Sequence, residues 1–205
     1  MNDYRRQAIR NLARRIDMEY SEDDSPGLMT HLQDFRLFGS GRNRCITNVL
    51  RRQEELMEYD LFIFDYEYDD WLHGKHNKRH HQTVFFIRSS RLSLPEMTMR
   101  PETLLHKIGD LVGFEDIDFV RFPKFSGQYR LTGTDEEYIR HHFNDEVLNY
   151  FTVNKGWTVE ALGFYLLLYR KDLLLPVDQI AKFYWRGREV YELLAPPRPP
   201  QNKTD

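Results

Sequence analysis

The first clear pattern along the chain is an amphipathic stretch between residues 3 and 16. Its apolar residues recur at helical spacing, and its basic residues fall on the other side. The apolar set is Tyr4, Ala8, Ile9, Leu12, Ala13 and Ile16, and the basic set is Arg5, Arg6, Arg10, Arg14 and Arg15. We predict an amphipathic helix over 3–16. Its arginines suit a solvated helix face, which we favour, or attraction to an anionic membrane surface or to nucleic acid.

Alternation between two faces predicts a β-strand over residues 58–70. One face carries Tyr59, Leu61, Ile63, Asp65 and Glu67, and the other is wholly aromatic, with Phe62, Phe64, Tyr66 and Tyr68. A strand over 82–88 returns after a polar connection around Gly74, which indicates a β-hairpin with a long basic loop. Further strands are predicted near residues 45, 97, 129, 157 and 164, and the strand at 97–100 is expected at a sheet edge.

Helix signals occupy much of the remaining chain. Pro101 suits the first turn of a helix that ends near residue 111, and Thr134 with Glu137 forms a capping-box pattern for the next helix. Another helix begins at Asn144 or Asp145, and the last follows Pro176 and continues to residue 194. Residues 195–205 carry four prolines, so we predict a disordered tail after a single domain over 1–194.

These elements together predict the fold class α+β. The expected core is a mostly antiparallel sheet of about six or seven strands packed with helices, followed by a long C-terminal helix. A strand series that ends in such a helix resembles a pleckstrin-homology-like barrel, in which the helices between residues 101 and 152 would be large insertions. A fold by itself does not give a function.

The composition is that of a chain able to form a core. Of the 205 residues, 40% are hydrophobic, 14% aromatic and 30% charged, and the net charge is −3. This balance argues against disorder and against a general polyanion binder, and we expect no specific nucleic-acid partner. The single cysteine, Cys45, excludes an internal disulfide, and its strand-like setting indicates a small buried hydrophobe. The longest apolar run, residues 164–169, is far shorter than the roughly 20 residues of a membrane helix. We expect a soluble cytoplasmic protein, peripheral at most to the inner membrane.

Five residues are candidates for an enzymatic site. Asp116 and Asp118 are two positions apart, so in an extended segment they share a side and could act as paired carboxylates. His141 and His142 follow a helix that begins with acids, and His106 lies on a predicted helix. No neighbouring nucleophile or phosphate-binding loop supports a catalytic role. We favour structural roles, as turn caps or ion-pair partners, for both aspartates.

Four histidines surround Gly74 in the predicted hairpin loop. His73, His76, His80 and His81 lie within nine positions, and imidazole nitrogens bind zinc, copper or nickel. Their spacing matches no closed zinc module, and the lysines and arginine between them would repel a cation. We favour a solvated basic loop and expect no cofactor, with metal binding at this loop as an alternative.

The order of several short motifs resembles a family of uncharacterised bacterial proteins. The motifs are FDYEY at 64–68, QTV at 82–84, LP at 94–95, RPE at 100–102, DIDF at 116–119, FS at 125–126, YRLTG at 129–133 and DE at 135–136. The resemblance covers about residues 10 to 194. Members are often called membrane proteins because a hydrophobic helix precedes the region that corresponds to residue 1, and this sequence does not contain that helix. The family implies neither an activity nor catalytic residues.

We expect a non-catalytic binding or scaffolding domain that acts in a protein complex or near a bacterial membrane surface. The basis is a rich core, a basic N-terminal helix and the lack of a catalytic constellation in the sequence. One alternative is an enzyme whose site is assembled only in three dimensions from the two aspartates and the histidines at 106, 141 and 142. A deep pocket that collects at least two of these residues would favour the enzyme, and a shallow groove lined by Arg and Tyr would favour binding.

Overall fold

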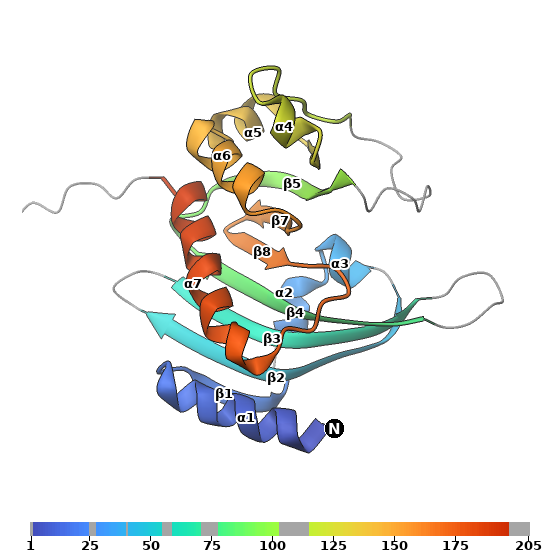
Figure 1. The fold of residues 1–205 in the computed structure, drawn as a ribbon, viewed down its shortest axis with the longest axis vertical. Helices are drawn as coiled ribbons and strands as arrows, with labels where there is room; N and C mark the ends of the chain where they lie inside the picture. The colour runs from blue at the N-terminus through green and yellow to red at the C-terminus, as the bar shows by residue number, and fades with distance from the viewer. Residues whose placement is uncertain are drawn as a thin grey trace, which may run out of the picture.

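The computed structural model describes residues 2–24, 28–39, 41–54, 59–70, 78–102 and 115–196, which form an α+β fold (Figure 1). One antiparallel sheet of eight strands has the order β1-β2-β3-β4-β8-β7-β5-β6. The strands are β1 (Glu19–Asp23), β2 (Arg42–Glu54), β3 (Tyr59–Asp70), β4 (Lys78–Ser89), β5 (Leu94–Pro101), β6 (Tyr129–Gly133), β7 (Thr158–Gly163) and β8 (Tyr165–Tyr169). The helices are α1 (Asn2–Arg15), α2 (Leu28–Leu32), α3 (Arg36–Gly39), α4 (Pro123–Ser126), α5 (Glu136–His142), α6 (Asp145–Val153) and α7 (Val177–Leu194).

The predicted α+β class, the seven predicted strands and the long C-terminal helix are confirmed. The strand that the sequence did not indicate is β1, whose residues Glu-Tyr-Ser-Glu-Asp show no alternation of apolar and polar positions. β5 is not an edge strand, because it pairs with β6 on one side and with β7 on the other. β1 and β6 stand at the two ends of the strand order, and no pairing joins them among the described residues. The sheet is therefore open and does not form a pleckstrin-homology-like barrel.

The β3–β4 hairpin is the longest regular pairing in the sheet. Its register runs without a shift from Tyr59 opposite Ser89 to Asp70 opposite Lys78. Because side chains alternate along a strand, odd-numbered residues of β3 face one side of the sheet and even-numbered residues face the other. The aromatic face predicted from the sequence is confirmed, since Phe64 and Tyr66 are fully buried.

The two faces of the sheet support two separate hydrophobic cores. One core packs the sheet against α1, α4, α5, α6 and α7 and includes Ile9, Phe125, Ile139, Phe151 and Phe183. The other core packs the aromatic face of β3 against α2 and α3 and includes Leu32, Phe38, Phe62, Phe64 and Tyr66. The sheet therefore lies between two layers of helices. Both layers are held by the hydrophobic effect, because large apolar side chains on each face are removed from water.

α7 approaches the sheet most closely at Gly187. A Cβ atom at this position would overlap the ring of Phe85 in β4. Glycine is unfavourable within a helix by roughly 1 kcal/mol relative to alanine. Here it lets the helix backbone lie directly on the aromatic ring.

Two helix boundaries differ from the sequence prediction, and α7 ends at Leu194 as predicted. Asp135, not Thr134, caps α5, and its side chain accepts a hydrogen bond from the backbone N–H of Tyr138. Pro101 ends β5 opposite Tyr129 instead of opening a helix, and the helix predicted up to residue 111 falls mostly in 103–114, outside the described residues. Ala195 is buried, and the carbonyl of Pro196 accepts a hydrogen bond from Arg91, so the packed chain extends beyond residue 194. Among the described residues, no helix has the length and apolar character that crossing a bilayer requires.

Candidate functional site

The candidate catalytic aspartates have local structural partners. The carboxylate of Asp116 accepts a hydrogen bond from the backbone N–H of Leu131 at 3.0 Å, and the backbone carbonyl of Asp118 accepts one from Arg140 at 2.8 Å. Burial raises the pKa of Asp116, and the hydrogen bond from Leu131 opposes that rise. Asp116 thus links its own segment, residues 115–118, to β6.

The candidate catalytic histidines do not join this pair. His141 is exposed, and a ring nitrogen of His142 lies 3.0 Å from the carbonyl oxygen of Tyr138 within the same helix. Among the described residues, no hydrogen bond or ion pair connects either histidine to Asp116 or Asp118. His106 lies outside the described residues.

The histidine cluster is divided between the two faces of the sheet. His80 and His81 belong to β4, so neither lies in a solvated loop, and His73 and His76 lie outside the described residues. His80 is buried, stacks on Tyr68 with ring centroids 4.7 Å apart, and contacts Asp172. His81 points to the other face, where its ring lies 3.1 Å from Glu67. The described residues contain no group of three or more side chains arranged to hold a metal ion.

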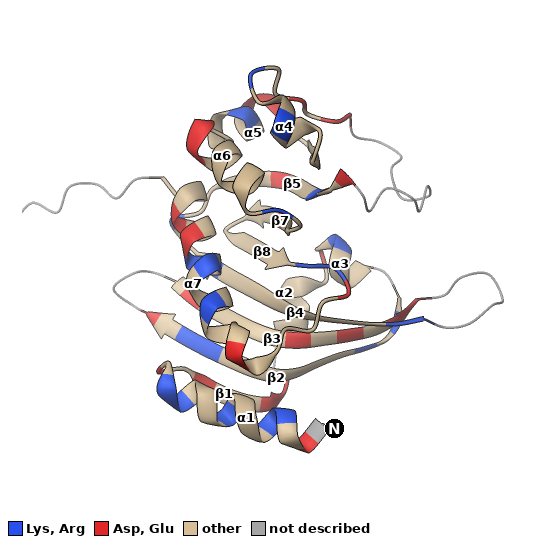
Figure 2. Ribbon diagram, viewed as in Figure 1, with Lys and Arg blue, Asp and Glu red and all other residues tan. Residues whose placement is uncertain are grey.

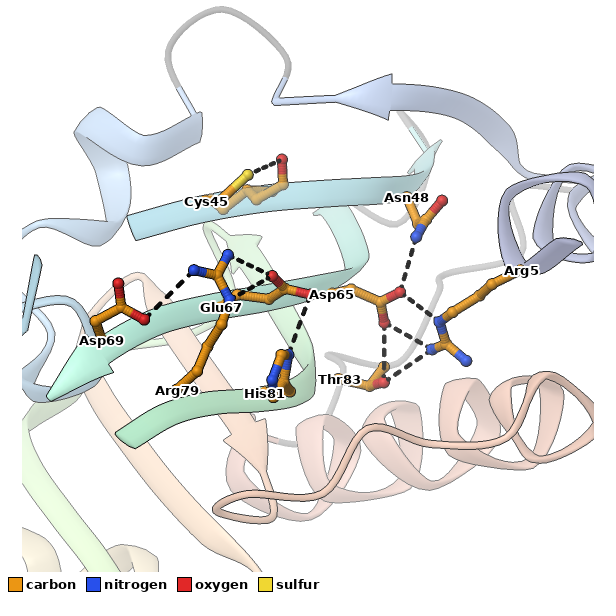
Figure 3. A network of polar contacts seen from close by, with 10 residues as sticks. Arg5, Cys45, Asn48, Asp65, Glu67, Asp69, Arg79, His81 and Thr83 are labelled. Carbon is orange, nitrogen blue, oxygen red and sulfur yellow. Dashed lines mark hydrogen bonds and ion pairs between the residues drawn. The ribbon is translucent and has the colours of Figure 1, made fainter. Parts of the chain in front are cut away.

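A polar network follows one face of β3 (Figure 3). Asp65, Glu67 and Asp69 alternate along this strand, and they stand opposite Thr83, His81 and Arg79 of β4. Each carboxylate has a cationic neighbour. The sequence contained the signal for this network, because acids at every second position of a strand share a face.

The Asp65 end of the network is buried and closed. Arg5 of α1 donates two hydrogen bonds to Asp65, at 2.7 and 2.8 Å, and a third to the carbonyl of Leu175 at 2.7 Å. Asn48 and Thr83 also donate to Asp65, at 2.9 and 3.1 Å. Arg5 therefore joins the N-terminal helix to the sheet and to the segment before α7. It is not available to a membrane surface, which corrects its predicted role.

The Glu67 end of the network is open to solvent. Arg79 donates to Glu67 at 2.7 Å and reaches Asp69 at 3.3 Å, and Asn43 donates to Asp69 at 2.8 Å. Partial burial raises the pKa of Glu67, but hydrogen bonds from Arg79 and His81 outweigh it, and the pKa is lowered overall. Cys45 lies opposite Glu67 on β2 and is exposed, contrary to the predicted burial.

The basic face of α1 is partly used by the protein itself. Arg10 pairs with Glu22 of β1, and its guanidinium lies 5.3 Å from the ring centroid of Tyr20. Figure 2 colours the basic positions along α1 blue. Arg14 and Arg15 remain exposed, so the surface that could meet an anionic partner is narrower than the sequence indicated. One side of the helix packs on β1 and the sheet through buried apolar residues.

The exposed side of α7 carries a solvent-exposed tryptophan. Trp185 is 62% exposed, whereas the apolar stripe of the same helix is buried. A hollow of about 460 Å³ surrounds it, lined by Lys182, Trp185, Arg186, Arg188, Glu189 and Glu192. The sequence held the signal for this site, because a tryptophan that falls outside the apolar stripe of a helix faces solvent.

A second groove continues from that hollow. It lies between α6 and α7, has a volume of about 830 Å³, and shares Glu189 and Glu192 with the hollow. Its lining is Asn144, Glu146, Asn149, Tyr150, Val153, Asn154, Glu189, Glu192, Leu193 and Ala195. Val153, which lines the groove from α6, is 79% exposed. Together the two hollows form one surface that carries charged residues of both signs and the exposed apolar side chains of Trp185 and Val153. We call it the α7 surface.

Comparison with known proteins gives one structural likeness and no sequence match. No protein-family model and no curated protein matches the chain. A similar solved structure is the crystal structure of the mycobacterial trehalose monomycolate transport factor A, TtfA, with a TM-score of 0.67 and 13% sequence identity. The likeness covers 95% of this chain and 97% of that chain. At this identity it shows a shared fold, extending over nearly the whole of both chains.

Proposed function

We propose that this protein is a non-catalytic binding or scaffolding domain of a bacterial transport complex near the membrane, and that it binds a partner protein through the α7 surface. The observation that carries the proposal is the exposure of Trp185 on a helix whose other aromatic residues are buried. A large aromatic side chain in water gains free energy when a partner covers it.

The neighbours of Trp185 have the composition of a protein interface. Arg188 lies 5.6 Å from its ring centroid, and Lys182, Arg186 and two glutamates complete the hollow. Tryptophan and arginine dominate the binding energy of many protein interfaces, with charged groups at the rim. A surface of this kind suits a folded partner better than a small molecule, which favours an enclosed and mainly apolar cavity.

The structural likeness to TtfA supports a role in a transport process. TtfA is a transport factor for trehalose monomycolate, and the shared fold extends over 95% of this chain. A fold can carry unrelated functions, so the cargo of TtfA is not transferred to this protein. What we carry over is participation in a transport complex.

A photo-crosslinking experiment tests the proposal. A photoreactive amino acid replaces Trp185 in the full chain expressed in its own bacterium, and a matched variant carries it at Gln7, an exposed position on α1. We expect one defined protein adduct at position 185 and not at position 7. Purified partner should then bind wild-type protein and lose at least about tenfold in affinity for Trp185→Ala, as for an interface hot spot.

Two results would contradict the proposal. One is the same adduct pattern at both positions, which would mean contact by random collision. The other is unchanged affinity of the purified partner for Trp185→Ala when the variant keeps its thermal stability.

A further inference from the structure

Trp157 is held between two arginines and a phenylalanine. It precedes β7, is 3% exposed, and stacks on Phe183 with ring centroids 5.3 Å apart and an interplanar angle of 11°. The guanidinium carbon of Arg170, just after β8, lies 4.3 Å from the centroid of the Trp157 ring. That of Arg186 in α7 lies 5.1 Å from the same centroid. Two cations from different elements thus meet at one indole ring.

Neither arginine forms an ion pair with a carboxylate among the described residues, and Glu189, which lines a hollow together with Arg186, accepts a hydrogen bond from Tyr150 at 3.0 Å instead. Arg170 donates to the carbonyl of Lys155 at 2.7 Å, and Arg186 donates to the side-chain oxygen of Asn154 at 3.3 Å. Both acceptors are uncharged. By contrast, Arg5 and Arg51 each form an ion pair with a buried aspartate. Burial lowers the pKa of Arg170, and the positive charge of Arg186 lowers it further.

Two buried donors of this cluster have no acceptor among the residues that the structure describes. They are Nε1 of Trp157 and Nε of Arg170. Buried N–H groups in folded proteins are nearly always paired with protein, water or a bound group. Unpaired donors beside two uncompensated positive charges require an acceptor, and an anion would satisfy the donors and the charges together.

We propose that Arg170, Arg186 and Trp157 form a binding site for a phosphate group, either on a soluble phosphate compound or on a phospholipid headgroup. Guanidinium groups recognise phosphate through paired N–H donors, and the indole N–H adds a neutral donor. Exposed Lys155 adds a third positive charge beside the site. Arg186 also lines the hollow at Trp185, so the two sites adjoin, but the phosphate site is argued from Trp157 and Arg170 and not from the exposure of Trp185.

Calorimetric titration of the full chain with inorganic phosphate is the first test. Titration with sodium chloride at equal ionic strength is the reference, because the two salt solutions then screen the charges of the protein equally. We expect saturable heat for wild-type protein and at least about tenfold weaker binding for the double variant Arg170→Gln/Arg186→Gln, which loses charge-assisted hydrogen bonds. The control Arg121→Gln/Lys124→Gln removes the same charge from exposed positions in and just before α4 and should bind as wild type does.

Co-sedimentation with vesicles distinguishes the source of the phosphate. One set contains equal parts of phosphatidylglycerol and phosphatidylcholine, and the other contains phosphatidylcholine alone. Binding to the anionic vesicles that is lost in Arg170→Gln/Arg186→Gln, but kept in the Arg121→Gln/Lys124→Gln control, assigns a lipid headgroup. Saturable inorganic phosphate binding without vesicle binding assigns a soluble compound.

The proposal is overturned if wild-type protein binds in neither assay. It is equally overturned if the Arg121→Gln/Lys124→Gln control loses as much binding as the site variant, because the effect would then come from net charge. Arg186→Gln alone, at a half-buried position of α7, gives the same comparison should the double variant fail to fold, as judged by circular dichroism.

Discussion

Arg5 in α1 and Asp65 in β3 form a two-pronged ion pair across 60 residues of sequence, with nitrogen–oxygen distances of 2.7 and 2.8 Å. The side chain of Asp65 is 4% exposed, so its charge depends on this arginine and on the hydrogen bonds from Asn48 and Thr83. Through Arg5 the N-terminal helix becomes part of the packed fold.

Removing Arg5 should therefore destabilise the protein strongly. Arg5→Ala leaves the Asp65 carboxylate buried without its cation, and losing one partner of a buried pair costs roughly 3 to 5 kcal/mol. Urea unfolding followed by circular dichroism measures this change. The matched control is Arg10→Ala, which breaks the exposed pair with Glu22 and should cost less than about 1 kcal/mol. Equal losses in the two variants would show that Arg5–Asp65 is not a structural anchor.

Gly187→Ala should lower the melting temperature, although alanine is the better helix former. The new methyl group would overlap the Phe85 ring, and overpacking in a core costs about 1 to 3 kcal/mol. Differential scanning calorimetry gives the measurement. Gln179→Ala, at an exposed position of the same helix, is the control and should leave the melting temperature nearly unchanged. A higher melting temperature for Gly187→Ala would mean that α7 does not approach β4 as closely as described.

Glu160 should make stability fall as pH rises. Burial raises the pKa of its carboxyl above the ordinary value of 4.5, although hydrogen bonds from Tyr169 and from the backbone of Arg36 oppose the rise. Because the folded-state pKa is the higher one, the protonated form favours the folded state. The stability that protonated Glu160 contributes is fully present below the unfolded-state pKa, and it is lost as the pH rises through the folded-state pKa.

The free energy of unfolding, measured by urea titration from pH 4 upward, tests this dependence. Glu160→Gln cannot ionise, so it should lack the part of the slope that wild-type protein shows in that window. Its absolute stability should also be lower, because an amide cannot accept from both Tyr169 and the α3 backbone as a carboxylate does. Glu115→Gln, at an exposed position, should keep the wild-type slope. An unchanged slope in Glu160→Gln would refute the prediction.

Cys45 should react with a thiol reagent in the folded protein. Its side chain is exposed on β2, and it is the only cysteine in the chain. Ellman's reagent in native buffer should release one equivalent of chromophore per chain, at a rate comparable to that of denatured protein, because an exposed thiol is limited by its own chemistry and not by unfolding. Reaction that begins only after denaturant is added would show that the thiol is buried.

The sequence by itself determined the elements whose signals are local. Alternating residues predicted β3 and β4, and helical spacing predicted α1 and α7, because burial of one face imposes a period on neighbouring residues. The same reasoning placed Asp65 and Glu67 on one face of a strand. A polar strand such as β1 has no such period and was missed.

Only the tertiary structure decided which distant residues meet. The position of β5 between β7 and β6, the burial of His80 and the pairing of Arg5 with Asp65 all depend on strand order. The same holds for Trp157, where arginines from after β8 and from α7 converge on a residue before β7. Periodicity tells which face a side chain occupies, but not which element lies against that face, because contacts between distant residues are set by how the whole chain closes around its two cores.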